Sequence, residues 1–199
     1  MTPAPADLPG AVKDLSDVFT TLRISHAFGG AIAQNYWGTV RATQDIDLLA
    51  SIPRIRFQEV AETLDAAGFR AAGTGKRDAA IDVAAMVAEE RDRHLFTIHR
   101  RLVKVEIFLP FLPIQTSILE RAVSCPFEDK TIRVTSAEDL VLLKMVFHRE
   151  KDLRDVRAIL LNQRGKLDLA YIRDGAGKLL ENPRVEELEA YIARYGTAG

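Results

Sequence analysis

Residues 24–50 read ISHAFGGAIAQNYWGTVRATQDIDLLA, and this stretch decides the fold. Its pattern predicts, in order, a strand over Ile24–Ala27, a turn at Gly29-Gly30, a helix over Ala31–Tyr36 and a strand over Asp45–Ala50. Two glycines allow the backbone to turn sharply and to approach a ligand closely. The first turn of the helix that follows offers unpaired N–H groups, so the junction is suited to binding an anion. A plain turn between a strand and a helix is the alternative.

The strand over residues 45–50 carries two acidic side chains on one face. Side chains alternate along a strand, so Asp45 and Asp47 point the same way, about 6.5–7 Å apart. Carboxylates this close repel each other unless a cation lies between them, and Mg²⁺ prefers such oxygen ligands together with substrate phosphates. The solvated face of an edge strand is the alternative, although the apolar residues 48–50 indicate a buried strand end.

A later strand, predicted over Leu102–Leu109, carries a further acid. Its apolar face consists of Val103, Val105 and Ile107, and Glu106 points the other way, beside Lys104. If this strand lies next to the strand of Asp45 and Asp47, Glu106 completes a trio of carboxylates. The alternative is a surface glutamate that pairs with Lys104.

The rest of the chain mixes helices and strands up to residue 135 and is helical beyond it. Helices are predicted over Leu8–Leu22, from Pro53 to Gly68, from Ser136, over Leu153–Leu161 and over Val185–Tyr195. Strands are predicted over His94–His99 and Thr131–Val134, and a turn over Gly73–Lys76. The segment Asp78–Ala88 is compatible with either a helix or a strand. The expected class is α+β: a small mixed β-sheet with helices packed on one face (residues 8–135), followed by a helical region (136–199) packed on it.

Composition narrows the class of protein. The 199 residues are 47% hydrophobic, as expected for a globular chain, and 27 basic against 28 acidic residues give a net charge of −1. A strong overall basic field is therefore excluded. The single cysteine, Cys125, forms no internal disulfide, and we find neither a signal peptide nor an apolar run of the roughly 18–20 residues that span a membrane. We expect a cytoplasmic protein without a membrane partner.

Together these motifs resemble the signature of the DNA polymerase β-type nucleotidyltransferases. The run Arg41-Ala42-Thr43-Gln44-Asp45-Ile46-Asp47 is similar to the Arg-x-Thr-x-Asp-x-Asp variant of the bacterial AbiEii-like toxin nucleotidyltransferases and their uncharacterised relatives. Residues 136–159 resemble the helical segment that follows the catalytic core in these proteins. Two positions depart from the common pattern: Gly-Ser is frequent where this chain has Gly29-Gly30, and the third acid is often Asp rather than Glu.

The resemblance implies a reaction and a set of site residues. An acceptor hydroxyl or phosphate would attack the α-phosphate of a nucleoside triphosphate (NTP) and release pyrophosphate. Mg²⁺ or Mn²⁺ would be held by Asp45 and Asp47, with Glu106 binding a second metal ion or accepting the proton of the acceptor. Nucleotide-binding residues would be Gly29 and Gly30 through their backbone N–H groups, together with Arg41, Thr43 and Lys144.

Several of these side chains have alternative roles. Lys144 either reaches a triphosphate or extends to solvent. Arg41 either touches phosphate or only pairs with Asp45 or Asp47. Asp152 and Asp155 either orient Lys144 or Arg149 or belong to a solvated helix face. His148 is expected at the surface, and Trp37 in the core rather than stacked on a base.

The acceptor and the partners stay open in the sequence. The leading hypothesis is a toxin, partnered by an antitoxin protein, that acts on tRNA or on a protein hydroxyl. The alternatives are a transferase for a small molecule such as an antibiotic, and a non-catalytic module that binds a nucleotide or a partner. A set of basic residues, the basic patch, bears on this choice: Lys76, Arg77, Arg91, Arg93, Arg100 and Arg101. If these residues converge on the metal site, a nucleic-acid acceptor is favoured; if they are scattered, a small acceptor is favoured.

Overall fold

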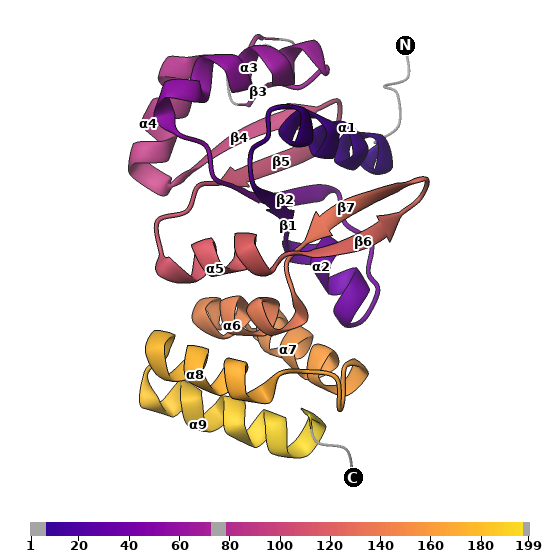
Figure 1. The fold of residues 1–199 in the computed structure, drawn as a ribbon, viewed down its shortest axis with the longest axis vertical. Coiled ribbons are helices and arrows are strands. Elements are labelled where there is room, and N and C mark those ends of the chain that lie inside the picture. Colours follow the sequence, from indigo (N-terminus) through magenta and orange to yellow (C-terminus); the bar gives the residue numbers. More distant parts are fainter. Residues whose placement is uncertain (1–6, 73–78, 197–199) are drawn as a thin grey trace. The chain divides into compact units, whose positions relative to one another are not determined.

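The computed structural model describes residues 7–72 and 79–196 (Figure 1). These residues divide into two compact units, the first made of the chain up to Gly30 and Thr43–Val134, the second of Ala31–Ala42 and the chain from Thr135 onward. The predicted turn over 73–76, with Lys76 and Arg77, lies outside the described residues.

The first unit is built on a mixed sheet of seven strands in the order β3-β4-β5-β2-β1-β7-β6 (Figure 1). Strand β2 is parallel to β5 and β1 is parallel to β7, whereas the other neighbouring pairs are antiparallel. The strands are β1 (His26–Phe28), β2 (Asp45–Ala50), β3 (Arg70–Ala71), β4 (Leu95–Arg100), β5 (Val103–Phe108), β6 (Val123–Phe127) and β7 (Lys130–Val134).

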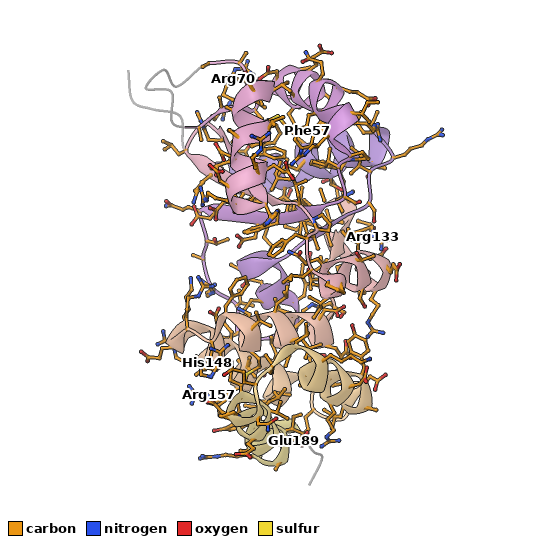
Figure 2. All side chains as sticks on the ribbon, turned by 90° about the vertical axis from the view of Figure 1, so that its left-hand side faces the viewer. Phe57, Arg70, Arg133, His148, Arg157 and Glu189 are labelled. Carbon is orange, nitrogen blue, oxygen red and sulfur yellow. The ribbon has the colours of Figure 1, made fainter. Side chains whose placement is uncertain are left out.

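Helices α1 (Leu8–Thr21), α3 (Phe57–Ala66) and α4 (Val83–Arg93) cover one face of this sheet (Figure 1). Apolar side chains that alternate along the central strands form this face, and Ile46 and Val105 among them are fully buried. Phe57 of α3, marked in Figure 2, lies with its ring 6.3 Å from that of Phe96. Helix α5 (Pro113–Arg121), which the sequence did not predict, contacts β1 and β2 from the other side. The expected α+β class with a mixed sheet is confirmed.

The second unit is helical, as predicted for the chain beyond residue 136. Helix α2 (Gly30–Trp37) contributes most of its length to this unit, which is completed by α6 (Ala137–Phe147), α7 (Glu150–Asn162), α8 (Leu169–Leu179), α9 (Asn182–Tyr191) and a last turn, Ile192–Gly196. The predicted start at Ser136 is confirmed, because its hydroxyl accepts a hydrogen bond from the Asp139 N–H at 3.1 Å. Among the described residues, no helix is both long and apolar enough to cross a membrane.

Residues 31–42, together with Thr135, lie in the second unit, although the predicted core spans residues 8–135. Trp37 donates its indole N–H to the Thr135 carbonyl at 2.7 Å, and the Trp37 carbonyl accepts from the Gln163 side chain at 3.1 Å. These contacts tie the segment to the C-terminal helices, although it lies between Gly30 and Asp45 in sequence. The limits of independently folding domains stay a prediction.

His26 on β1 is a buried titratable group in the first unit. Its ring packs 5.6 Å from that of Phe19, its Nδ1 lies 3.0 Å from the Ile24 carbonyl, and its Nε2 has no hydrogen-bond partner in the described structure. Burial, and secondarily the positive charge of Arg133, lower the pKa of His26 below the usual 6.5. The folded protein therefore favours the neutral form of this ring.

We expect the free energy of unfolding to decrease as the pH falls below about 6.5. Below this pH the unfolded chain is protonated at His26, whereas the folded chain is not. The contribution of His26 to stability is therefore present above its pKa in the unfolded chain and is lost as the pH falls toward its pKa in the folded chain. The loss is at most about 1.4 kcal/mol per pH unit. Urea denaturation at pH 7.5 and 5.5 should show a smaller decrease for His26→Gln than for wild type; equal decreases would contradict the assignment.

Candidate functional site

The Gly29-Gly30 turn and Asp47 form one structural element. The Gly29 N–H donates to the Asp47 carbonyl at 2.8 Å, which closes the end of β1 onto β2. Gly30 has a φ of +50°, and a Cβ built on it would lie 1.7 Å from Oδ2 of Asp47. The carboxylate of Asp47 therefore occupies space that only a glycine leaves free.

The pairing of β2 with β5 brings the three predicted acids to one face of the sheet. Asp47 lies opposite Glu106, and Asp45 lies opposite Lys104. Paired residues on neighbouring strands point to the same side, and their strands are about 4.8 Å apart. This is the face away from α1, α3 and α4, where Asp45 is exposed and Asp47 and Glu106 are half-buried. The two strands are thus neighbours, which was the condition for a trio of carboxylates.

Glu106 is engaged by two cations. Its Oε1 lies 2.9 Å from Nζ of Lys104 and 4.0 Å from Nη2 of Arg93. The pairing with Lys104 is the alternative that the sequence left open. Arg93, at the end of α4, belongs to the basic patch whose convergence on the metal site the sequence left open, and the pairing of β4 with β5 brings this one member to Glu106.

The three acids fit a hard divalent cation in the chemistry of their donors. All three offer carboxylate oxygens from one face, and the glycine at position 30 leaves room for the carboxylate of Asp47. Within the described residues, however, no group of three His, Cys, Asp or Glu side chains is already close enough to hold a metal ion. Their role as ligands stays a prediction.

Thr43 and Arg41 shape the entry into β2. The Thr43 hydroxyl donates to the Asp45 carbonyl at 3.0 Å and accepts from its N–H at 3.2 Å. In the second unit, the Asn35 side chain accepts from the Arg41 N–H at 2.9 Å and donates to its carbonyl at 3.1 Å. The Arg41 guanidinium lies 3.9 Å from Asp155. The two predicted residues are thus held by local hydrogen bonds.

Lys144 is the centre of a buried charge network between α6 and α7. Its Nζ lies 2.5 Å from Asp155 and 3.8 Å from Asp152, and the lysine is 5% exposed, so it does not extend to solvent. Asp152 also accepts from Nε of Arg149 at 2.5 Å. Asp152 and Asp155 therefore orient both cations, as one of the two expectations had it. With Arg41, the network holds three cations and two carboxylates.

We expect Lys144→Ala to destabilise the protein by about 3 kcal/mol, because it leaves the buried Asp152 and the half-buried Asp155 without their common cation. Lys178→Ala is a matched control, since Lys178 pairs with Asp174 at 2.5 Å but is 71% exposed in its side chain. Its expected effect is below about 1 kcal/mol. Chemical denaturation of both variants measures the difference; equal midpoints would show that the network contributes nothing to folding.

The remaining candidate residues each have partners of their own. His148 is half-buried, and its Nε2 lies 2.6 Å from Glu187; Figure 2 shows it in the helical unit near Arg157. The half-buried Trp37 packs in the second unit rather than standing free. Of the predicted basic patch, Arg100 pairs with Asp14 of α1 at 2.5 Å, whereas Arg93 lies beside Glu106. The described members of the patch therefore do not converge.

Several solved structures share this fold. One match is the antibiotic-resistance factor ANT(2'')-Ia in solution, with a TM-score of 0.51, 14% identity and coverage of 94% of this chain and 92% of that one. Another is the same factor in a crystal with adenylyl-2''-tobramycin, with a TM-score of 0.51, 14% identity and coverage of 94% of this chain and 98% of that one. A third is an antigenic nucleotidyltransferase-like protein from Paracoccidioides brasiliensis, with a TM-score of 0.51, 15% identity and coverage of 96% of this chain and 95% of that one. At this identity the likeness establishes the fold alone.

Sequence comparison establishes the family. No curated protein sequence matches the chain. The model of the family described as "Nucleotidyl transferase AbiEii toxin, Type IV TA system" matches residues 13–192, which include the turn, the three acids and the network around Lys144. Since the match covers most of the chain, this protein belongs to the AbiEii family and is a nucleotidyltransferase.

Proposed function

We propose that the protein transfers a nucleoside monophosphate from an NTP to an acceptor hydroxyl or phosphate, with release of pyrophosphate. The observation that carries this proposal is the placement of Asp47, whose carboxylate lies against the glycine turn on one side and whose strand partner on the other is Glu106. A turn that presents N–H groups beside a row of carboxylates is suited to a triphosphate bound through cations.

Asp45, Asp47 and Glu106 would hold Mg²⁺ or Mn²⁺. A divalent cation in this place supplies neutralisation of the charge on the phosphates and on the attacking and leaving oxygens. Glu106 is the acid best placed to accept the proton of the acceptor, because it lies on the far side of Asp47 from the glycine turn.

The N–H groups at Gly29 and Gly30 would hold the triphosphate. Lys144 and Arg41, which both lie beside Asp155, would add positive charge. Thr43 would act through the backbone of Asp45, to which its hydroxyl is bound. Phosphate recognition would thus come from backbone and cationic groups, and metal binding from the acids.

The family description favours a toxin that is opposed by an antitoxin protein. We place its action in the cytoplasm. The described basic residues do not form one continuous patch, and this scatter favours a small acceptor over a nucleic acid. A small-molecule acceptor is the second candidate, because the ANT(2'')-Ia crystal contains an adenylylated antibiotic.

The experiment that tests this proposal is incubation with each α-labelled NTP, Mg²⁺ and a cell extract, followed by separation of RNA, protein and small molecules. We expect one nucleotide to label one fraction, and chelation of the metal to prevent it. Nucleotide binding without label in any fraction would instead support the non-catalytic module.

A further inference from the structure

Lys104 on β5 lies among the three acids of the candidate site. The parallel pairing of β2 with β5 places Lys104 opposite Asp45. Glu106 lies opposite Asp47 in the same register, so all four side chains share one face of the sheet. The ammonium of Lys104 contacts the third acid directly, since its Nζ lies 2.9 Å from Oε1 of Glu106. The chain therefore brings a positive charge of its own to the row of carboxylates.

Arg93 adds a second positive charge at the same carboxylate. Its Nη2 lies 4.0 Å from Oε1 of Glu106, which is the oxygen that Lys104 also contacts. The backbone holds the end of α4 that carries Arg93, because the His94 carbonyl accepts from the Leu109 N–H at 2.8 Å, directly after the end of β5. Glu106 thus has two cationic neighbours that belong to the chain.

The position of Lys104 within the site indicates which part of the reaction it serves. The Gly29 N–H donates to the Asp47 carbonyl, so the glycine turn adjoins β2 on the side of β1. Lys104 and Glu106 are on β5, which is the neighbour of β2 on the opposite side. Since the triphosphate is assigned to the glycine turn, the ammonium of Lys104 lies on the side of the attacking acceptor.

The balance of charge supports a single metal ion at these acids. In two-metal sites, the ions stabilise both the attacking and the leaving oxygens. Two divalent cations bound by three carboxylates leave a surplus of one positive charge. One divalent cation together with Lys104 and Arg93 leaves the same surplus on the same three acids. A second divalent cation beside Glu106 would also be repelled by both of these side chains at close range.

We propose that Lys104 takes the place of a second metal ion, so that the transferase works with one divalent cation. Asp45 and Asp47 supply most of the ligands of that cation, and Glu106 shares its negative charge between the cation and the ammonium of Lys104. This inference rests on the proposed function, since the place of the triphosphate defines the side from which the acceptor approaches.

The ammonium of Lys104 stabilises the negative charge that develops on the attacking oxygen of the acceptor. As the bond from this oxygen to the α-phosphorus forms, the bond from the α-phosphorus to pyrophosphate breaks. The proton of the acceptor passes to Glu106, as in the proposed function. A lysine performs this task at a fixed place, because its charge is attached to the strand that also carries the proton acceptor.

A count of the bound metal ions tests this proposal without any measurement of activity. The protein is saturated with an NTP analogue that cannot be cleaved after the α-phosphate and is titrated with Mn²⁺, whose free form is read by electron paramagnetic resonance. The wild type should bind a single ion per chain. Lys104→Glu replaces the ammonium by a further carboxylate and should bind two. Two ions in the wild type would overturn the proposal.

The same titration separates failure of this inference from failure of the proposed function. If the wild type does not bind the analogue, the proposed function is wrong. Titration without the analogue still counts the ions at the acids, with Asp47→Asn as the variant that should lose them. A single ion in the wild type then supports the exchange of a metal ion for Lys104, and two ions again contradict it.

Removal of the ammonium measures its contribution to the rate. Lys104→Ala should slow the transfer about 100- to 1,000-fold, with unchanged affinity for the NTP analogue, and Lys104→Arg, which keeps the charge, should restore much of the rate. The fold should not depend on Lys104, because its side chain is 49% exposed. Lys130→Ala is the matched control, since this strand lysine pairs with Asp17 of α1. It should keep the rate and the ion count of the wild type, whereas an equal rate of Lys104→Ala and wild type would show that Lys104 supplies no charge to the reaction.

Discussion

Asp47→Asn should abolish nucleotidyl transfer, with a decrease in rate of at least roughly a thousandfold, or about 4 kcal/mol of activation free energy. Asparagine has the shape of aspartate, so it fits the space against Gly30 that the carboxylate occupies. It lacks the negative charge that holds a divalent cation and, with it, the triphosphate. The expected loss therefore lies in the chemistry and not in the fold.

Two measurements separate these effects. Metal-dependent binding of the labelled nucleotide should be lost in Asp47→Asn, whereas its thermal midpoint should stay close to that of wild type. Asp17→Asn is the control, because Asp17 lies on α1, on the other face of the sheet, where it pairs with Lys130. That variant should keep both binding and transfer. Undiminished metal-dependent binding by Asp47→Asn would show that the cation is held elsewhere.

The same variant tests the toxin hypothesis in cells. Expression of the wild-type chain should arrest growth, and Asp47→Asn should relieve the arrest at an equal protein level. A wild type that transfers a nucleotide in vitro but does not arrest growth would retain the enzymatic function and remove the toxin role.

Local patterns were sufficient to predict most strands that carry the candidate site. Strand β2 has the bounds that its alternation predicted, and β5 lies within the predicted Leu102–Leu109. The alternation of side chains also assigned Glu106 to a polar face. This assignment was possible because the alternation depends only on the residues of one strand. Which strand lies beside β5 is a long-range property, so the register of Asp47 with Glu106 required the structure.

Other elements were missed because their local signals point elsewhere. Helix α8 contains Gly175 and Gly177, and glycines inside a segment normally weaken the evidence for a helix. In the structure, a Cβ on Gly175 would lie 2.5 Å from Cδ1 of Leu142 on α6, so this glycine permits close packing of two helices. Helix α5 is short and buries the polar Gln115, which obscures its apolar stripe.

The position of residues 31–42 was beyond the reach of any local pattern. Their partners Thr135 and Gln163 are separated from Trp37 by 98 and 126 residues of sequence. The same holds for the stacking of Phe111 on His94, since nothing in the sequence around His94 indicates it. Such contacts depend on the tertiary fold, whereas periodicity reports only which face of an element is apolar.

Gly30→Ala has the second-largest expected effect, because one added methyl group acts on the candidate acid directly. An alanine at a φ of +50° is strained by about 1–2 kcal/mol. The new Cβ would lie 1.7 Å from Oδ2 and 2.7 Å from Cγ of Asp47, so the carboxylate has to rotate away. Since misplacement of a catalytic group by about 1 Å costs roughly a hundredfold in rate, we expect a loss of at least that size.

Gly177→Ala is the control for Gly30→Ala, because no atom would lie within 4 Å of its new Cβ, and alanine favours the helix there. It should keep full activity and gain slightly in thermal midpoint. If Gly30→Ala loses stability but keeps the wild-type rate, the position of the Asp47 carboxylate does not limit the reaction. If Gly30→Ala lowers the rate of transfer while Asp47→Asn keeps the wild-type rate, the turn contributes through its N–H groups and not through Asp47. Only a loss in both variants supports a triphosphate and a cation held by the same turn and acid.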